Sequence, residues 1–189
     1  YPSIQITLKI SGSGEVVDRI RDGSLEIGMV GARWSDRRVV LEEAFSDELV
    51  LTVYPDHPWA GRKSIRLDEL QDEPFIMREK GSGTRMVMQQ ILEAKGFDSA
   101  LLHGVAEMGS TEAVRQGIKA RIGISILSAQ AVAEDIQRGT LVTLETEGVR
   151  FLRPFYLVQR KNRQLSPLGI AFLGFLKAAA AERNQKLDA

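Results

Sequence analysis

Short segments with alternating apolar residues are followed, along this chain, by segments with helical spacing. Residues 4–10 place an apolar side chain at every second position, which is typical of a strand with one buried face. Residues 16–20 carry apolar side chains at helical spacing, and Gly23 suits the left-handed residue that ends a helix. The alternation resumes at 25–29. The pattern predicts a βαβ unit with two parallel strands and a right-handed crossover.

The same order of elements is predicted twice more in the middle of the chain. The apolar residues 75–77 lead through the loop 80–85 into a helix that ends at Gly96. Residues 101–108 lead through the loop 109–112 into another helix. The remaining elements are a helical turn at 67–70, a helix that Ser128 can cap, and short strands at 49–54, 122–127, 141–144 and 155–158.

The last helix is predicted to begin after Ser166, an N-cap residue, with Pro167 at the first helical position. Its large apolar side chains form one stripe that we expect to be buried: Leu168, Phe172, Phe175 and Leu176. The tail after Arg183 is polar and is expected to fray. Together the elements predict an α/β fold of two compact halves, which meet near Glu73–Pro74 and again near Arg153–Pro154.

Composition argues against several classes of function. The 25 basic residues balance 25 acidic ones, so the chain lacks the basic surplus of a surface that grips DNA phosphates. Without cysteine it has no disulfide, thiol nucleophile or thiolate metal site. No apolar run reaches the roughly 20 residues that span a bilayer, so we expect no membrane contact. His57 lies in a Pro-Asp-His-Pro turn and is expected at the surface.

Three loops of small residues each precede a predicted helix. Such a loop leaves backbone N–H groups free at the positive end of the helix dipole, which favours a bound anion. Hydroxyl groups add donors, and Arg85 could supply a charged fork for an oxyanion. The candidate ligand-binding residues are Ser11, Gly12, Ser13 and Gly14, then Gly81, Ser82, Gly83, Thr84 and Arg85, and finally Gly109, Ser110 and Thr111.

Helix capping is the competing explanation for these loops, because serine and threonine at helix starts are usually plain N-caps. Capping explains 109–111 better than ligand contact does, the two explanations are balanced for 11–14, and ligand contact is favoured for 81–85. The recurrence of three matched loops strengthens the ligand hypothesis. No nucleophile elbow, phosphate loop, dinucleotide fingerprint or zinc motif occurs. We therefore expect no enzyme activity, no cofactor and no metal.

Several segments, in order, resemble the effector-binding domain of LysR-type transcriptional regulators. They are the opening Tyr1–Pro2 strand, residues 23–29, 55–58, 109–114 and 122–127, and the Ser166–Pro167 helix that ends in Phe175–Leu176. The resemblance covers nearly the whole chain. It implies a fold like that of type II periplasmic binding proteins, with two α/β lobes joined by two crossing strands. Lobe I would hold 1–73 and 159–189 and lobe II 74–158, with hinge strands near 73–77 and 154–159.

The resemblance also implies a function. The chain would be a cytoplasmic ligand-sensing domain that binds a small anionic metabolite or inorganic oxyanion between its lobes, through the three loops. Binding would shift the populations of DNA-bound states of the full-length protein, whose winged helix-turn-helix is absent from this chain. Sensing domains would pair as an antiparallel homodimer, with Glu15–Arg21 and the Leu25 strand facing lobe II of the partner, and as a tetramer at full length.

Two alternatives remain open. A solute-binding protein of an ABC transporter shares this fold class but would need an export signal, and a small enzyme would need a base or nucleophile that we do not find. Two positions also depart from the family pattern. Gly14 stands where relatives often have a polar side chain, and Arg121 stands where a glycine is common. If Arg121 must be left-handed, it costs about 1 kcal/mol.

Overall fold

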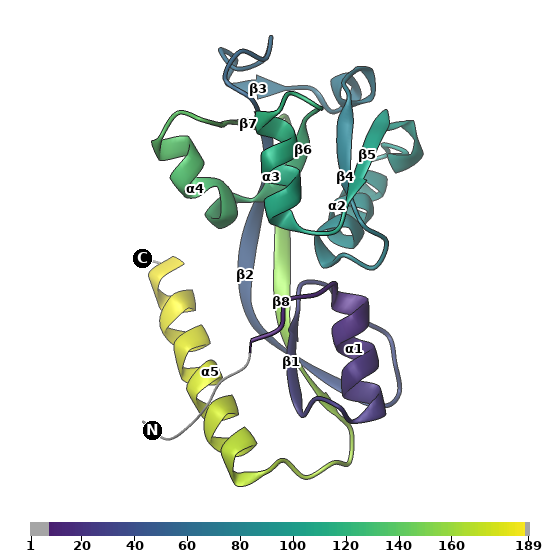
Figure 1. Cartoon of the computed structure of the whole chain (residues 1–189), viewed down its shortest axis with the longest axis vertical. Coiled ribbons are helices and arrows are strands. Elements are labelled where there is room, and N and C mark those ends of the chain that lie inside the picture. The colour runs from purple at the N-terminus through teal and green to yellow at the C-terminus, as the bar shows by residue number, and fades with distance from the viewer. Residues whose placement is uncertain (1–7, 188–189) are drawn as a thin grey trace.

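Two long strands run through the whole molecule in the computed structural model, which describes residues 8–187 and the side chains up to Glu182. They are β2 (Val39–Val53) and β8 (Phe151–Arg160), and Figure 1 shows them joining a lower and an upper lobe. The two strands pair antiparallel from Val39↔Arg160 to Leu49↔Phe151, with a register shift between Glu43 and Phe45. Because each strand belongs to both lobes, their ladder sets how the lobes are joined.

The lower lobe, here lobe I, surrounds the first half of β2 and the second half of β8. It contains α1 (Ser13–Asp22), β1 (Ile27–Val30) and α5 (Pro167–Leu187). The strand β1 pairs antiparallel with β8. Val17 and Ile20 of α1 are fully buried in a cluster with Val30 and Val158. On the other side of the sheet, α5 packs against β2 and β8.

The upper lobe, lobe II, holds the middle of the chain. Its elements are β3 (Ser64–Ile65), the 3-10 helices η1 (Leu67–Asp72) and η2 (Ser99–Leu101), β4 (Phe75–Arg78), α2 (Gly83–Ala94), β5 (Gly104–Met108), α3 (Thr111–Lys119), β6 (Ser125–Ser128), α4 (Ala129–Gln137) and β7 (Val142–Thr146). Both β6 and β7 pair antiparallel with β2, β3 pairs parallel with β7, and β4 pairs parallel with β5.

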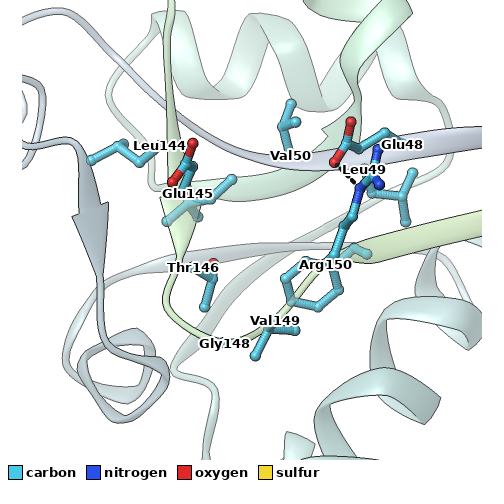
Figure 2. Close-up of a pocket in the computed structure, with 11 residues that line it drawn as sticks. Glu48, Leu49, Val50, Leu144, Glu145, Thr146, Gly148, Val149 and Arg150 are labelled. Carbon is cyan, nitrogen blue, oxygen red and sulfur yellow. Dashed lines mark hydrogen bonds and ion pairs between the residues drawn. The ribbon is translucent and has the colours of Figure 1, made fainter.

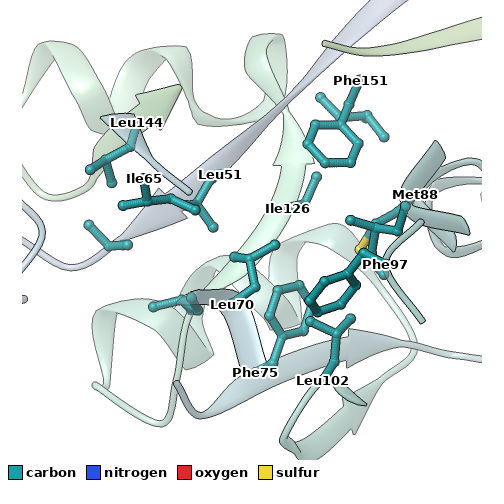
Figure 3. Packing of buried hydrophobic residues seen from close by; sticks show 14 of the residues in the cluster. Leu51, Ile65, Leu70, Phe75, Met88, Phe97, Leu102, Ile126, Leu144 and Phe151 are labelled. Atoms are coloured by element: carbon teal, nitrogen blue, oxygen red, sulfur yellow. The ribbon is translucent and has the colours of Figure 1, made fainter. Parts of the chain in front are cut away.

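The core of lobe II lies between the end of β2 and the β4–β5 pair. Leu51, Leu70, Phe75 and Ile126 are almost completely buried there, and Phe97 closes one side (Figure 3). Burying each such side chain stabilises the fold by about 1.5–3 kcal/mol. This packing fixes the ends of β4 and β5, from which α2 and α3 begin.

The boundary between the lobes differs from the expected one near 73–77. Residues from Leu49 onward share a single core with Phe75 and its neighbours, so the first crossing occurs inside β2. The alternation predicted only the end of this strand, at 49–54. Before Leu49 the strand carries the charged residues Glu42, Glu43 and Asp47, which interrupt the apolar alternation. The length of the strand follows from its pairing with β8.

The predicted opening βαβ unit is not formed among the described residues. Ile4 and Ile6 lie outside them, while Leu8 and Ile10 are exposed and belong to no strand. Within residues 8–187, β1 pairs with β8 and with no other strand. The parallel pairs are instead β3 with β7 and β4 with β5.

The last helix begins as predicted but turns a different side to the core. Ser166 Oγ accepts a hydrogen bond from Gly169 N at 3.0 Å, which confirms the N-cap. Phe172 and Phe175, expected to be core, are 44% and 67% exposed. The buried side is formed by Leu173, Leu176 and Ala180, whose spacing of three and four residues faces the strands. The predicted stripe is therefore rotated by about one residue from the packed one.

Two further positions test the sequence analysis. His57 is buried rather than exposed. Both of its ring nitrogens have partners there: Nδ1 accepts a hydrogen bond from Trp59 N at 3.1 Å, and Nε2 lies 3.3 Å from Glu73 Oε2. The expectation of a surface turn was wrong at this side chain. Arg121 has φ 60°, so the left-handed backbone anticipated there is present.

The lobes touch directly where α2 begins. A Cβ added at Gly83 would lie 2.7 Å from Ser13 Oγ and 2.8 Å from the carbonyl carbon of Gly31, so only glycine fits without movement. Ser13 Oγ accepts a hydrogen bond from Gly31 N at 3.2 Å, and Gly14 N donates to the carbonyl oxygen of Gly81 at 3.3 Å. The first turns of α1 and α2 therefore pack on each other across the lobes.

A buried carboxylate joins α3 to α4 in lobe II. Asp135 is 3% exposed and accepts hydrogen bonds from Arg115 and from Thr140 Oγ1, and it pairs with Lys119. Burial raises the pKa of Asp135, but the hydrogen bonds from Lys119, Arg115 and Thr140 outweigh it and lower the pKa from 3.8 to about 2.

We expect Asp135→Asn to lower the free energy of unfolding by about 2–3 kcal/mol at pH 7. The folded-state pKa is depressed, so this stabilisation is present above pH 3.8 and is lost as the pH falls through about 2. Urea unfolding at pH 7 and pH 3 measures the free energy of unfolding of both proteins. The difference in this free energy between wild type and Asp135→Asn should be smaller at pH 3 than at pH 7. The neighbouring exposed Glu134→Gln is the control, with a change of about 0.5 kcal/mol or less. Equal stabilities of wild type and Asp135→Asn at pH 7 would contradict this account.

Gly83→Ala should lower the melting temperature by about 4–8 °C, because the added methyl group overlaps Ser13 and Gly31. Helix propensity alone predicts the opposite sign, since alanine favours a helix by about 1 kcal/mol over glycine. Gly109→Ala is the matched control, as its Cβ would meet no heavy atom within 4 Å. A Gly83→Ala variant as stable as the Gly109→Ala variant would show that the lobes do not pack here.

Candidate functional site

The three loops singled out in the sequence lie at the starts of α1, α2 and α3, which face one another between the lobes (Figure 1). Within residues 8–187, no side chain caps α1 after Gly12 or α2 after Ser82. Gly14 N of α1 already donates to the carbonyl oxygen of Gly81, so the other first N–H groups of the two helices are the donors left at the positive ends of the helix dipoles. The helix α3 differs, because Ser110 Oγ accepts a hydrogen bond from Ala113 N at 3.0 Å and caps it.

An arginine–carboxylate pair lies where the loops converge. Arg78 donates from Nε to Glu79 Oε2 at 2.8 Å and from Nη2 to Glu79 Oε1 at 2.9 Å, and its Nη1 donates to Thr111 Oγ1 at 2.8 Å. A Cβ added at Gly12 would lie 3.3 Å from Glu79 Oε1. The backbone carbonyl oxygen of Glu79 accepts a hydrogen bond from Ser82 N at 3.1 Å. The Arg78 and Glu79 side chains are 12% and 24% exposed. Residues of all three loops therefore meet around one ion pair.

Sequence reasoning missed Arg78 and Glu79, although both could have been found. They directly follow the strand predicted at 75–77 and precede the loop at 80–85. Charged side chains at the carboxyl end of a strand lie where ligands usually bind in α/β folds.

Arg85, the arginine that the sequence favoured, is bound to a carbonyl oxygen and a carboxylate of lobe II. Its Nη1 donates to the carbonyl oxygen of Arg78 at 2.8 Å and to Glu107 Oε2 at 2.6 Å. Met77, the register partner of Glu107, packs toward α2, whereas Ile76 packs toward α3. Because strand side chains alternate, Arg78 and Arg85 lie on opposite faces of the β4–β5 pair. Arg85 therefore joins α2 to the strands β4 and β5.

A second buried arginine ties the crossing strands to α2. Arg153 of β8 and Asp47 of β2 face each other in the ladder, and Arg153 Nη2 donates to Asp47 Oδ2 at 2.5 Å. Nη1 donates to Thr84 Oγ1 at 2.6 Å, and the guanidinium lies 4.4 Å from the ring centre of Phe155. Burial lowers the pKa of Arg153, while Asp47 opposes that shift. Thr84 is thus bound to the strands that join the lobes.

Two open hollows of the surface lie away from this site. One of about 520 Å³ is lined by β2, β7 and the turn into β8, and Figure 2 shows Arg150 bonded to Glu48 at its rim. A second lies between β2, β8 and α5. Neither is lined by a residue of the three loops. Among the described residues we find no group of three side chains suited to a metal ion, and no helix there is long and apolar enough to cross a membrane.

Comparison with known proteins places this geometry in a family. The chain matches the LysR substrate binding domain over residues 1–181. It is 34% identical to a RuBisCO operon transcriptional regulator of Allochromatium vinosum over 99% of this chain and 61% of that protein. It is 31% identical to the transcriptional activator CmpR of Synechocystis over 94% of this chain and 58% of that protein. The chain thus spans about three fifths of these relatives.

Solved structures agree with the sequence relatives. The regulatory domain of Synechocystis CcmR, in complex with 2-PG, superposes with a TM-score of 0.84 and 30% identity, covering 95% of this chain and 85% of that one. The effector binding domain of QuiR, in complex with shikimate, gives a TM-score of 0.80 at 18% identity, over 90% of this chain and 79% of that one. The two lobes joined by β2 and β8 form the type II periplasmic-binding-protein-like fold that the family resemblance implied, and the chain belongs to the LysR substrate binding domain family.

Proposed function

We propose that this chain binds a small oxyanion or anionic metabolite at Arg78, where the three loops meet. The observation that carries the proposal is a partly buried guanidinium that donates to Thr111 at the start of α3 and to Glu79, whose carboxylate lies beside Gly12 at the start of α1. An arginine fork can bind two oxygens of one anion, and each charge-assisted hydrogen bond contributes about 1.5–3 kcal/mol. Three or four such bonds support an affinity of about micromolar. The complex of the Synechocystis regulatory domain with 2-PG supports a small ligand in this fold.

Binding there would act on the angle between the lobes. Gly14 of lobe I bonds to Gly81 of lobe II, and Thr84 is held by Arg153 on a crossing strand. An anion entering between the helix starts must rearrange these contacts. The ligand would thereby shift the population of lobe arrangements, which is how a small site controls a larger assembly.

The whole protein, of which this chain would form about three fifths, is proposed to be a cytoplasmic transcriptional regulator. Relatives with names of that kind support it. DNA contact would come from a part outside this chain, with sensing domains paired as an antiparallel homodimer and assembled as a tetramer at full length. The names of these two relatives do not favour the alternative of a transporter's solute-binding protein. The test is a mobility-shift assay with full-length protein and its own promoter, with and without added anion.

We expect Arg78→Ala to weaken the binding of inorganic phosphate and of 2-PG at least about tenfold, because it removes the charged fork. Isothermal titration calorimetry measures these affinities. The matched control is Arg66→Ala, which removes an exposed arginine that directly precedes η1. Arg85→Ala tests the residue that the sequence favoured. Since Arg85 is held by Glu107 on the other face of β4–β5, its loss should weaken binding less.

If Arg85→Ala weakens anion binding as much as Arg78→Ala or more, Arg85 and not Arg78 is the main anion-binding residue. Unchanged affinity in Arg78→Ala would refute the proposed site. Thermal denaturation of each variant separates lost binding from lost folding.

A further inference from the structure

We propose that the Glu79 carboxylate is a built-in competitor for the anion site, and that a ligand must displace it from Arg78. This inference rests on the proposed function. Its observation is that Glu79 already makes the contacts expected of a bound anion. Both of its oxygens accept hydrogen bonds from Arg78, and one of them lies beside Gly12 at the start of α1.

The position of Glu79 differs from that of the other carboxylates nearby. Asp47 is buried between β2 and β8, where losing Arg153 would leave a charge without water. Glu107 pairs with Arg85 on the far face of β4–β5. Of these three carboxylates, Glu79 alone combines an arginine partner at the loop junction with a side chain that reaches solvent, so it can leave without burying an unpaired charge.

The local backbone explains both the pairing and the possibility of release. Neighbouring residues of a strand point to opposite faces, so Arg78 and Glu79 could not pair if both were in β4. The strand ends at Arg78, which lets Glu79 turn back onto it. Two residues later Gly81 has φ 90°, a conformation that suits glycine and allows the loop to turn sharply.

A tethered carboxylate makes the site selective for strongly charged ligands. It acts at an effective concentration of about millimolar or more, so free monocarboxylates at lower concentration lose the competition. A dianion such as phosphate offers a second charge to the N-termini of α1 and α2, which one carboxylate cannot match. Glu79 would therefore determine specificity, favouring phosphate-type anions over simple carboxylates.

The test is Glu79→Gln, which removes the charge and keeps the shape, studied by calorimetry with inorganic phosphate and with acetate. We expect phosphate to bind about tenfold or more tightly than in wild type, and acetate binding to become measurable. Glu107→Gln is the matched control, since it releases Arg85 instead, and it should leave both affinities within about twofold. Glu79→Asp, whose shorter side chain cannot keep both hydrogen bonds to Arg78, should give an intermediate gain and provides the same test if Glu79→Gln does not fold.

The outcomes separate this inference from the proposed function. If phosphate binds wild type in a manner that Arg78→Ala abolishes, but Glu79→Gln and Glu79→Asp bind it no more tightly, the competitor is refuted and the site stands. If Arg78→Ala leaves phosphate affinity unchanged both in the wild type and in the Glu79→Gln variant, the proposed site itself is refuted. A tenfold gain that also appears in Glu107→Gln would refute a special role for Glu79.

Discussion

The antiparallel ladder between β2 and β8 runs from one lobe into the other and leaves few ways to arrange what is attached to it. In lobe I the ladder carries β1, α1 and α5, and in lobe II it carries β6 and β7. At its centre Asp47 and Arg153 pair across the two strands, and Arg153 reaches out to Thr84 at the start of α2. The same ladder that joins the lobes therefore also positions a helix start between them.

The inter-lobe region is closed by the protein's own charges. Arg78 and Arg153 each have a carboxylate partner, and the close contact of Gly83 with Gly31 brings the loops together. A binding site in this state would bind an external anion by exchange of ion-pair partners rather than by filling an empty cavity. Exchange of one partner for another would change contacts on both lobes, and in the proposed function this connects ligand binding to the lobe angle.

Much of the architecture could be predicted from the sequence, because period-two and helical patterns mark β4, β5, α2 and α3 directly. The three helix starts were also found, since Gly and Ser before a helix leave a local signature. The charged half of β2 was missed because its strand character comes from pairing with β8. Phe172 and Phe175 of α5 were predicted to be buried but are exposed. The side of a helix that is buried depends on how the helix packs against the strands, which composition does not show.

The loops of the candidate site could be predicted from the sequence, but its ion pairs could not, for a related reason. Loop glycines are visible in one segment, but the pairing of Asp47 with Arg153 joins residues 106 positions apart. A crystal structure of this chain grown with selenate, located by its anomalous scattering, tests the central claim most directly. The account predicts selenate on Arg78 between the starts of α1 and α2, with the Glu79 side chain turned away. Selenate bound elsewhere, or bound there with Glu79 still on Arg78, would contradict it.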